Sequence, residues 1–263
     1  MNSALSYLKR QRRRIEDQQA LEGRSQTFSL ARYQLHTQLT RVIDSHAYGI
    51  CLDIGSGHAP FKQKLATIAS RVICMDVEDR IGRTDIIADV QNMPDMEDAS
   101  IDTVLCSQVL EHVPRPWDAL SEIHRVLKQG GKAILSVPHL SSIHEAPHDY
   151  FRYTEFGLAS MLRAQGFEIL ELHRAGGLVS FLGHYVMLVG LSLLASIPVV
   201  LRVSQWINYS VMVRALAAVD YFVGLRSVFP CNYVVVAAKT QKTDYRELRT
   251  GDSGPPRRPA VDD

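Results

Sequence analysis

The sequence has few cysteines, and none of them stands in a metal-binding or redox spacing. Each of the four lies within an apolar run that is expected to be a buried strand: Cys51, Cys74, Cys106 and Cys231. Because no CxxC motif and no cysteine–histidine ligand spacing is present, these residues are expected to be reduced, structural thiols. The sequence therefore predicts no metal site, and reduced thiols favour a cytoplasmic location.

An excess of charge of either sign is also lacking. Lys and Arg total 29 and Asp and Glu total 28, which leaves a net charge of +1. This balance gives no general attraction to polyanions, so no nucleic-acid partner is expected. The first residues have no apolar core and do not read as a secretory signal. An apolar fraction of 46% with 22% charged residues is ordinary for a folded chain and excludes a largely disordered one.

One long stretch lacks charged residues altogether. Residues 176–201 contain no Asp, Glu, Lys or Arg, and at roughly 1.5 Å per residue they could cross a hydrocarbon layer of about 30 Å. A single crossing is excluded, because the strands expected on either side belong to one sheet. A return crossing is costly, since charged residues follow: Arg202, Arg214, Asp220 and Arg226.

Residues 176–229 are therefore expected to form an apolar helical insertion. It could lie in a membrane interface, form a re-entrant hairpin that turns at Pro198, or be buried as a cap over a ligand site or as a dimer interface. The length of the uncharged run favours peripheral association with the cytoplasmic face of the inner membrane. The basic run at residues 9–14 would assist on an anionic surface.

The best-marked feature is a short apolar run, residues 50–54, that ends in a glycine turn. Gly55 and Gly57 stand at alternate positions, and Pro60 suits the first turn of a helix. An apolar run of this length closed by glycine is typical of a buried strand in a parallel sheet. Glycine lets the backbone turn sharply and approach a ligand closely. Strand, glycine turn and helix together indicate a nucleotide-type binding unit.

Strands and helices alternate along the rest of the chain. Further strands are expected at residues 71–75, 85–89, 101–106, 132–137, 167–173 and 231–238. Helices are expected at residues 28–43, 61–69, 117–127 and 154–165. The third of these helices is followed by a basic turn and a double glycine, residues 128–131, which is a typical helix stop. This alternation predicts an α/β fold with a doubly wound parallel sheet.

Five segments, in this order, resemble the class I S-adenosylmethionine-dependent methyltransferases. They are Leu52-Asp53-Ile54-Gly55-Ser56-Gly57, Asp76, Asp89, Leu110-Glu111-His112-Val113 and residues 125–131. The resemblance covers residues 49–177 and the last strand, about half of the chain. It implies a Rossmann-like sheet of seven strands with an antiparallel last strand, and S-adenosyl-L-methionine as the cofactor. Residues 145–154 resemble a subgroup associated with bacterial surface-polysaccharide and envelope-glycan biosynthesis.

A nicotinamide-dependent dehydrogenase also combines a glycine turn with an acid, but three features disfavour it. Ala59 stands where its third glycine would be, a second acid ends the third strand, and the chain has no second mononucleotide half. The predicted divisions are a basic helical region at 1–46, a methyltransferase core at 47–175, the insertion at 176–229, a closing strand at 230–240 and a disordered tail at 241–263.

The resemblance implies a cofactor site at the carboxyl ends of the strands. The glycine turn would approach the methionine portion, where Asp53 can order nearby polar groups. Asp76 could accept hydrogen bonds from both ribose hydroxyls, and Asp89 would hold the adenine amino group. The other residues expected in the cofactor pocket are Gly55, Ser56, Gly57, Val77, Val90, Ser107, Gln108 and His112.

Methyl transfer to a sugar hydroxyl needs an aligned acceptor and a group that takes its proton. His148 and Asp149 are the first candidates for catalysis, and His144 is a further one, because they follow the fifth strand at the ligand-binding edge. Residues expected to bind the acceptor are Glu145, Tyr150, Arg152 and Tyr153. The alternative is a structural loop in which Asp149 caps, the aromatic rings pack and Arg152 pairs with an acid.

The sequence thus favours O-methylation of a glycan or a lipid-linked saccharide. A quinone, a lipid or another apolar small molecule is the alternative acceptor, which the apolar insertion favours. A cofactor-binding scaffold without catalysis is a third hypothesis, and it predicts tight cofactor binding with expendable His148 and Asp149.

Overall fold

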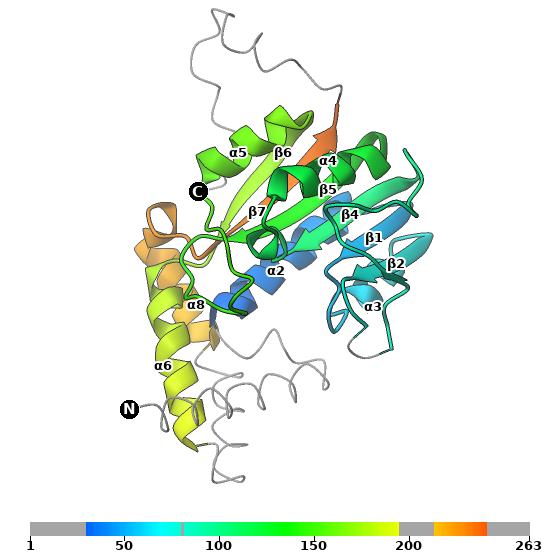
Figure 1. The fold of residues 1–263 in the computed structure, drawn as a ribbon. Helices are drawn as coiled ribbons and strands as arrows, with labels where there is room; N and C mark the ends of the chain where they lie inside the picture. The colour runs from blue at the N-terminus through cyan, green and yellow to red at the C-terminus, as the bar shows by residue number, and fades with distance from the viewer. Residues whose placement is uncertain (1–29, 80–81, 195–212, 241–263) are drawn as a thin grey trace, which may run out of the picture. The chain divides into compact units, whose positions relative to one another are not determined.

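The computed structural model of the chain describes residues 30–79, 82–194 and 213–240 and contains a seven-stranded sheet (Figure 1). The strands lie in the order β3-β2-β1-β4-β5-β7-β6. Their bounds are β1 Ile50–Ile54, β2 Arg71–Asp76, β3 Ile86–Ile87, β4 Ile101–Ser107, β5 Leu127–Pro138, β6 Phe167–Ala175 and β7 Asn232–Lys239. Residues 1–29 of the basic helical region predicted at 1–46, the tail predicted at 241–263 and the turn predicted at Pro198 lie outside the described residues.

The pairing of the strands confirms the predicted fold class. β1 pairs in parallel with both β2 and β4, β3 extends the sheet beside β2, and β5 pairs in parallel with β4. β7 is antiparallel to β5. The chain runs outward from β1 to β3 and then crosses back to β4, so the strand order reverses between β1 and β4. Ligands of open α/β sheets bind at the carboxyl edge of such a switch point.

The helices begin where the sequence supplies suitable residues. The bounds are α2 Leu30–His46, α3 Lys62–Ala66, η2 Leu110–His112, α4 Pro116–Val126, α5 Glu155–Ala164, α6 Leu178–Leu194, α8 Val213–Val223 and η4 Leu225–Ser227. Pro116 opens α4, where a missing N–H costs nothing. At α5 the Thr154 side chain caps the helix by accepting the N–H of Gly157.

The core of the sheet is apolar on both the strands and the helix that packs on them. Leu52, Val104 and Leu135 are fully buried on neighbouring strands. The buried face of α4 carries Ala119, Leu120, Ile123 and Val126 at helical spacing. Each large side chain of this kind contributes about 1.5–3 kcal/mol through burial, so the core can hold the ends of the strands in fixed positions.

Two predicted boundaries are wrong. Residues 128–131 are no helix stop, because α4 ends at Val126 and β5 begins at once with Leu127 in an extended conformation. The glycines lie instead where the β4–β5 register shifts, and a Cβ on Gly131 would stand 2.8 Å from the Lys128 carbonyl oxygen. The third strand is only Ile86–Ile87, because the chain then turns and Asp89 forms an isolated antiparallel bridge with Asn92.

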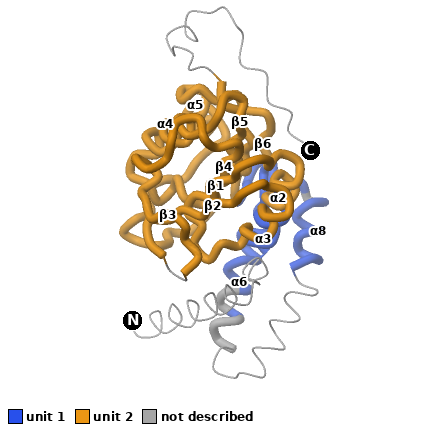
Figure 2. Tube along the Cα trace, turned by 90° about the vertical axis from the view of Figure 1, so that its right-hand side faces the viewer, with its two compact units in different colours: residues 1–38, 174–231 blue, residues 39–173, 232–263 orange. Residues whose placement is uncertain are grey.

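The chain divides into two compact units (Figure 2). We call residues 39–173 and 232–263 the sheet unit, and residues 1–38 and 174–231 the insertion unit. In the insertion unit a carboxylate on α8 caps α6. Asp220 is buried and accepts the N–H groups of Gly177 at 2.6 Å and Val179 at 3.2 Å. The negative charge at the start of α6 also complements the helix dipole.

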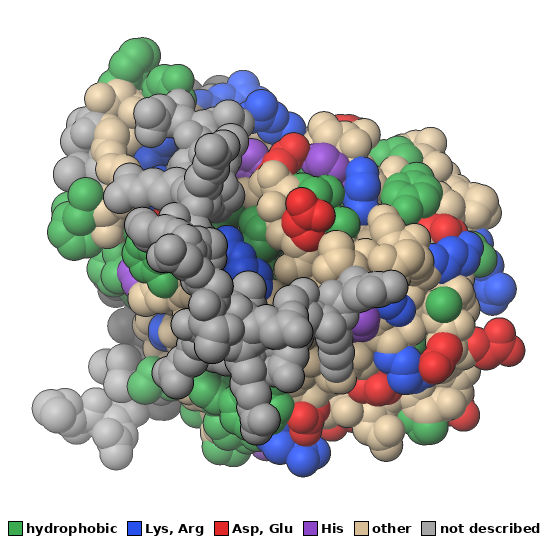
Figure 3. Space-filling model, turned by 90° about the horizontal axis from the view of Figure 1, so that it is seen from above, with side chains coloured by type: hydrophobic (Ala, Val, Ile, Leu, Met, Phe, Trp, Pro, Cys, Tyr) green, Lys and Arg blue, Asp and Glu red, His purple; other side chains and the backbone are tan. Residues whose placement is uncertain are grey.

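No helix in the described parts of the chain combines the length and the apolar character that a membrane crossing requires. Helices α6 and α8 nevertheless expose large apolar side chains, among them Val186 at 71% and Phe222 at 84% exposure. On the face seen in Figure 3, acidic and basic side chains of the described residues are interspersed, as the small net charge leads one to expect.

Candidate active site

The turn after β1 is fixed by its backbone. Gly55 and Gly57 have φ values of +66° and +52°, in the left-handed region. A Cβ on Gly55 would stand 2.3 Å from Cγ2 of Val109, so a side chain at this position meets both strain and a clash. The N–H groups of Gly55 and Ser56 donate to the Met75 carbonyl oxygen at 2.8 and 3.1 Å. The turn is thereby tied to the end of β2.

Asp76 ends β2 and binds the same turn. Its Oδ2 accepts the N–H of Gly57 at 2.8 Å, and its Oδ1 accepts the N–H of Val77 at 2.8 Å. A carboxylate oxygen has two lone pairs, so each oxygen keeps one for a further donor. The carboxylate is therefore oriented by the backbone and still able to accept two ligand hydroxyls.

Two buried polar atoms beside this turn have no hydrogen-bond partner among the described residues. They are Oδ2 of Asp53 and the Ser56 hydroxyl oxygen, on residues that are each 3% exposed. Burial first, and the charge of Asp76 second, raise the pKa of Asp53 to about 7. An unpartnered buried polar atom costs about 1–3 kcal/mol. A cofactor that brings hydrogen-bond donors to this point would remove that cost, so the residues fit the predicted cofactor.

The predicted adenine side is arranged differently. Asp89 is exposed, and its Oδ1 accepts the backbone N–H of Gln91 at 2.8 Å, while the Gln91 amide donates to both carboxylate oxygens. Val90 is buried in the core, and Val77 is 63% exposed. Asp89 thus shapes its own turn, and an adenine amino group would share the carboxylate with Gln91.

Ser107 and Gln108 connect the ends of β4 and β5. The hydroxyl oxygens of Ser107 and Ser136 are 2.9 Å apart, and the Gln108 N–H donates to the Ser136 carbonyl at 2.9 Å. Gln108 itself has a φ of +56°, which is strained for a residue with a side chain. The chain therefore turns sharply where η2 begins.

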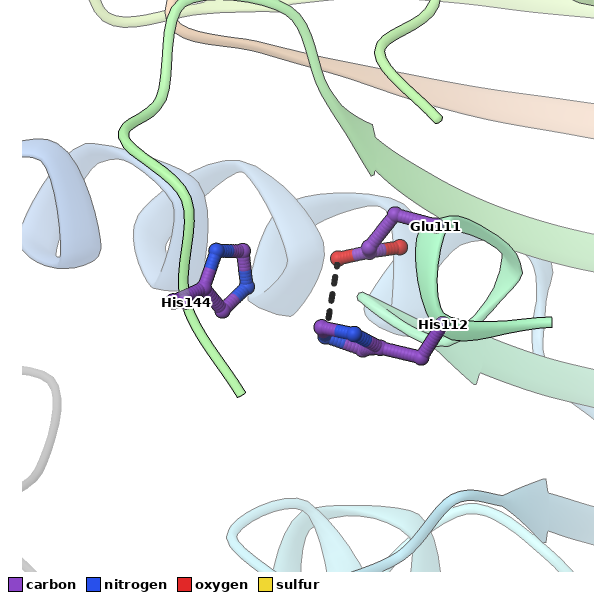
Figure 4. Close-up of side chains that lie close together, drawn as sticks. All are labelled: Glu111, His112 and His144. Atoms are coloured by element: carbon purple, nitrogen blue, oxygen red, sulfur yellow. Dashed lines mark ion pairs between the residues drawn. The ribbon is translucent and has the colours of Figure 1, made fainter. Parts of the chain in front are cut away.

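Glu111 on η2 is the functional candidate that sequence reasoning missed. It is fully buried, and neither carboxylate oxygen has a partner among the described residues. Burial raises its pKa to about 8. Its Oε1 lies 3.8 Å from Nε2 of His112, and the rings of His112 and His144 meet edge to face at 4.8 Å between centroids (Figure 4). The only signal in the sequence is a Glu-His pair set between the apolar residues Leu110 and Val113.

The loop after β5 contains an ordered ion pair. Asp149 accepts two hydrogen bonds from the Arg152 guanidinium, at 2.6 and 2.8 Å, and its side chain is 2% exposed. Its Oδ2 also accepts the N–H of His144 at 2.8 Å. The Arg152 guanidinium holds the pKa of Asp149 well below its usual range. The structure therefore brings Asp149, Arg152 and His144 together, and the pairing of Arg152 with an acid agrees with the structural alternative for this loop.

The other residues of the loop are not gathered in one place. The His148 ring is exposed, and its Nδ1 lies 3.2 Å from the Tyr150 hydroxyl. Its carbonyl oxygen, by contrast, contacts Nδ1 of His112 at 2.5 Å. Glu145 is exposed with a φ of +52°, whereas Tyr153 is buried and donates its hydroxyl proton to the Leu110 carbonyl at 2.8 Å.

Comparison with known proteins agrees with this geometry. Residues 52–135 match the family model of the methyltransferase domain. A protein of Mycolicibacterium smegmatis, described as a probable S-adenosylmethionine-dependent methyltransferase, is 32% identical over 48% of this chain and 56% of its own length. The ubiquinone biosynthesis O-methyltransferase of Burkholderia vietnamiensis is 27% identical over 49% of this chain and 70% of its own length. The chain thus spans little more than half of the first relative.

Solved structures share the fold at lower identity. The Burkholderia thailandensis 1,6-didemethyltoxoflavin-N1-methyltransferase, with 1,6-didemethyltoxoflavin and S-adenosylhomocysteine bound, has a TM-score of 0.50 and 19% identity, over 78% of this chain and 77% of its own. A [4+2]-cyclase has a TM-score of 0.54 and 19% identity, over 80% and 81%. Because a methyltransferase and a cyclase both match, the fold alone does not fix the reaction.

Proposed function

We propose that this protein is an S-adenosylmethionine-dependent O-methyltransferase whose acceptor is a glycan or a lipid-linked saccharide. The match of residues 52–135 to the methyltransferase domain model and the likeness to a probable S-adenosylmethionine-dependent methyltransferase support the type of reaction. One observation carries the proposal. The turn at 55–57 leaves the buried polar atoms of Asp53 and Ser56 without partners beside the oriented carboxylate of Asp76, and ionisable side chains follow β4 and β5 at the same edge.

The residues of the turn would hold the cofactor, which supplies a methyl group already activated on a sulfonium. Asp76 would accept the ribose hydroxyls with the lone pairs that the backbone leaves free. Asp53 and Ser56 would accept donors of the methionine portion. Gly55 lets the backbone come close, because no Cβ fits there.

On the acceptor side we propose that His148 takes the hydroxyl proton. Its ring is exposed and close to the Tyr150 hydroxyl, so both can meet a polar ligand. Asp149 is held by Arg152 and is a positioning residue in this proposal, because its carboxylate is already engaged. Glu145 and Tyr150 are exposed on the same loop and would contact the saccharide.

A second acceptor class has its own support. One relative is named for O-methylation in ubiquinone biosynthesis. Exposed apolar side chains in the insertion unit also suit a quinone or a lipid, among them Leu182, Val186, Tyr221 and Phe222. A quinone precursor and a sugar both offer a hydroxyl oxygen, so the same residues would serve either reaction.

We further propose that residues 176–229 associate peripherally with the cytoplasmic face of the inner membrane. Val186 on α6 and Phe222 on α8 are strongly exposed, and burial of such side chains in an interface is favourable. Co-sedimentation with anionic vesicles tests this. The double variant V186E/F222E should lose most binding, while an exposed-site control, E168Q in β6, should keep it. Equal binding of both variants would remove the insertion from this role.

The acceptor is best identified in cells. Envelope glycans and lipids are compared by mass spectrometry with the gene present, deleted, or replaced by D76A. A methyl group lost from a sugar supports the first acceptor class, and one lost from a quinone or lipid supports the second. Calorimetric titration with S-adenosylhomocysteine serves as the control for the cofactor. Binding without any lost methyl group would leave the non-catalytic scaffold as the better hypothesis.

A further inference from the structure

We infer that Glu111, His112 and His144 form a binding site for a divalent transition-metal cation of the kind that zinc represents. Each of the three side chains offers one ligand atom, and these atoms all lie within 4.8 Å of one another. Figure 4 shows the two imidazole rings and the carboxylate facing a common point, although they come from η2 and from the loop after β5. The sequence predicted no metal here, because the three residues share no ligand spacing.

The state of Glu111 is the first independent observation. Buried side-chain oxygens almost always have a hydrogen-bond partner, yet both oxygens of this fully buried carboxylate have none among the described residues. The contact of Oε1 with His112 Nε2 is 3.8 Å long, which is beyond hydrogen-bond reach. A cation bound between the carboxylate and the imidazoles would supply the missing partner.

The hydrogen bonds of the two histidines are the second observation. Nδ1 of His112 lies 2.5 Å from the His148 carbonyl oxygen, and Nδ1 of His144 lies 3.1 Å from the Ser142 carbonyl oxygen. A carbonyl oxygen only accepts, so Nδ1 of His112 carries a proton and its Nε2 keeps a lone pair when the ring is neutral. The Ser142 carbonyl favours the same tautomer for His144, whereas the Arg152 guanidinium, a donor 3.5 Å from that Nδ1, opposes it. Metal-bound histidines typically donate their other N–H to a carbonyl in this way.

Charged neighbours leave the site available to a cation. The basic side chain of Arg152 has Nη2 3.5 Å from Nδ1 of His144, but it also makes two bonds to Asp149. Asp149 Oδ2 lies 3.6 Å from the same Nδ1, and a carboxylate there favours the Nδ1–H tautomer. Around Glu111 the positive charge of Arg152 is opposed by the negative charges of Asp149 and Glu145.

The donor set indicates which cation fits. Two imidazoles and one carboxylate suit zinc and related metals, whereas magnesium and calcium prefer oxygen ligands. Donors of a tetrahedral zinc site stand about 3.4 Å apart. The 3.8 Å separation of Glu111 and His112 needs an adjustment of a few tenths of an ångström, and His144 on its loop would move further.

Three protein ligands leave the fourth position of a tetrahedral cation open, as in catalytic zinc sites. A hydroxyl bound there would have a lowered pKa and would be a better methyl acceptor. This role rests on the proposed O-methyl transfer, whereas cation binding itself does not. The two parts can therefore fail separately.

The test uses the full-length protein, freed of metal by a chelator, and titrates it with Zn²⁺ alone. The wild type should bind one equivalent, and E111Q and H144A should each bind at least 10-fold more weakly. E168Q is the matched control, since it removes an exposed carboxylate elsewhere in the sheet unit and should bind as the wild type does. Co²⁺ should give the intense visible absorption of a tetrahedral site in the wild type and lose it in H144A.

A readout of folding keeps the test decisive. S-adenosylhomocysteine binding by E111Q and H144A, measured in parallel, shows whether each variant keeps its fold. H144A alters a half-exposed loop residue and serves if E111Q does not fold. Failure of the wild type to bind Zn²⁺, or binding by folded H144A that equals the wild type, would overturn the inference. Zinc binding in a protein that transfers no methyl group would instead leave the site and remove the proposed function.

Discussion

The ligand-binding edge of the sheet has a proposed cofactor half, residues 53–57 and 76–77, and a proposed acceptor half, residues 110–113 and 139–154. The two halves are held together in different ways. On the cofactor half, backbone groups of Gly55, Ser56 and Gly57 bind the end of β2 through Met75 and Asp76. On the acceptor half, side-chain bonds add to the backbone bond that the N–H of Tyr150 donates to the Glu111 carbonyl oxygen at 2.8 Å. The His112 ring binds the carbonyl of a residue 36 positions later, and Asp149 is fixed by Arg152.

The family model covers residues 52–135 and ends before the acceptor loop begins. The cofactor half thus lies within the matched region, and we expect the acceptor half to carry what is particular to this chain.

The largest effect is expected from Gly55→Ala. The added Cβ would meet Val109 at 2.3 Å and enforce a left-handed φ on a residue with a side chain. We expect a loss of about 2–4 kcal/mol in unfolding free energy and loss of S-adenosylhomocysteine binding. Thermal denaturation and calorimetry measure the two effects.

Gly130→Ala is the control for this prediction. Gly130 has a φ of +75°, but a Cβ there would have open space around it. Only the backbone strain of about 1 kcal/mol should appear, with cofactor binding intact. Equal losses of stability and of cofactor affinity in the two variants would show that the clash with Val109 has no effect. The conformation of the turn at Gly55 would then not be what the cofactor site requires.

Asp76→Ala comes next in size. It removes the acceptor for two backbone N–H groups and for the proposed ribose hydroxyls. Hydrogen bonds to a charged group are worth about 1.5–3 kcal/mol each, so S-adenosylhomocysteine affinity should fall by about 100-fold or more. Asp89→Ala should cost only a few-fold, because that exposed carboxylate already serves Gln91. Calorimetric titration of both variants ranks them, and a reversed ranking would contradict the assignment.

Arg152→Ala probes the acceptor half. It leaves the nearly buried Asp149 carboxylate without its partner, and the loop that carries His144 and His148 should lose its order. We expect acceptor turnover to fall at least 10-fold while S-adenosylhomocysteine affinity changes less than twofold. Arg152→Lys should restore part of the activity, because one charged donor remains. A large loss of cofactor affinity in Arg152→Ala would break the distinction between the two halves.

The smallest effect is a pH dependence of cofactor binding through Asp53. Its folded pKa is raised to about 7, so in the free protein the carboxyl is largely protonated below that pH. A raised acid pKa stabilises the fold below the unfolded pKa of about 3.9, and this contribution is lost as pH rises through the folded pKa.

Donors of a bound cofactor favour the ionised form of the Asp53 carboxyl. Affinity for S-adenosylhomocysteine should therefore rise a few-fold between pH 5 and about 7 and then level off.

Asp53→Asn isolates this group from others that titrate nearby. The variant cannot ionise, so its affinity should stay flat over the same pH range, and binding should release no proton. Calorimetry in buffers of different ionisation enthalpy measures the proton count directly. A flat profile in the wild type would mean that the cofactor does not meet the Asp53 carboxyl.

Most of the fold could be predicted because its signals are local. Apolar runs closed by an acid or glycine mark β1 and β2, and the helical spacing of residues 117–126 marks α4. The start of β5 could not be predicted, because a glycine pair such as Gly130-Gly131 is compatible both with the end of a helix and with a β-bulge. Only the register of β5 against β4 distinguishes them.

In the candidate site, too, some features could be predicted from local sequence signals and others could not. The sequence by itself determined the glycine turn and the acid at Asp76, because a buried strand followed by φ-positive glycines leaves few alternatives. Only the tertiary structure brings the side chains of Glu111, His112 and His144 close together. Burial and the meeting of η2 with a loop more than 30 positions later leave the carboxylate beside the His112 ring, with no hydrogen-bond partner among the residues that the structure describes. Such contacts depend on packing over the whole sheet unit, and no spacing in the chain encodes them.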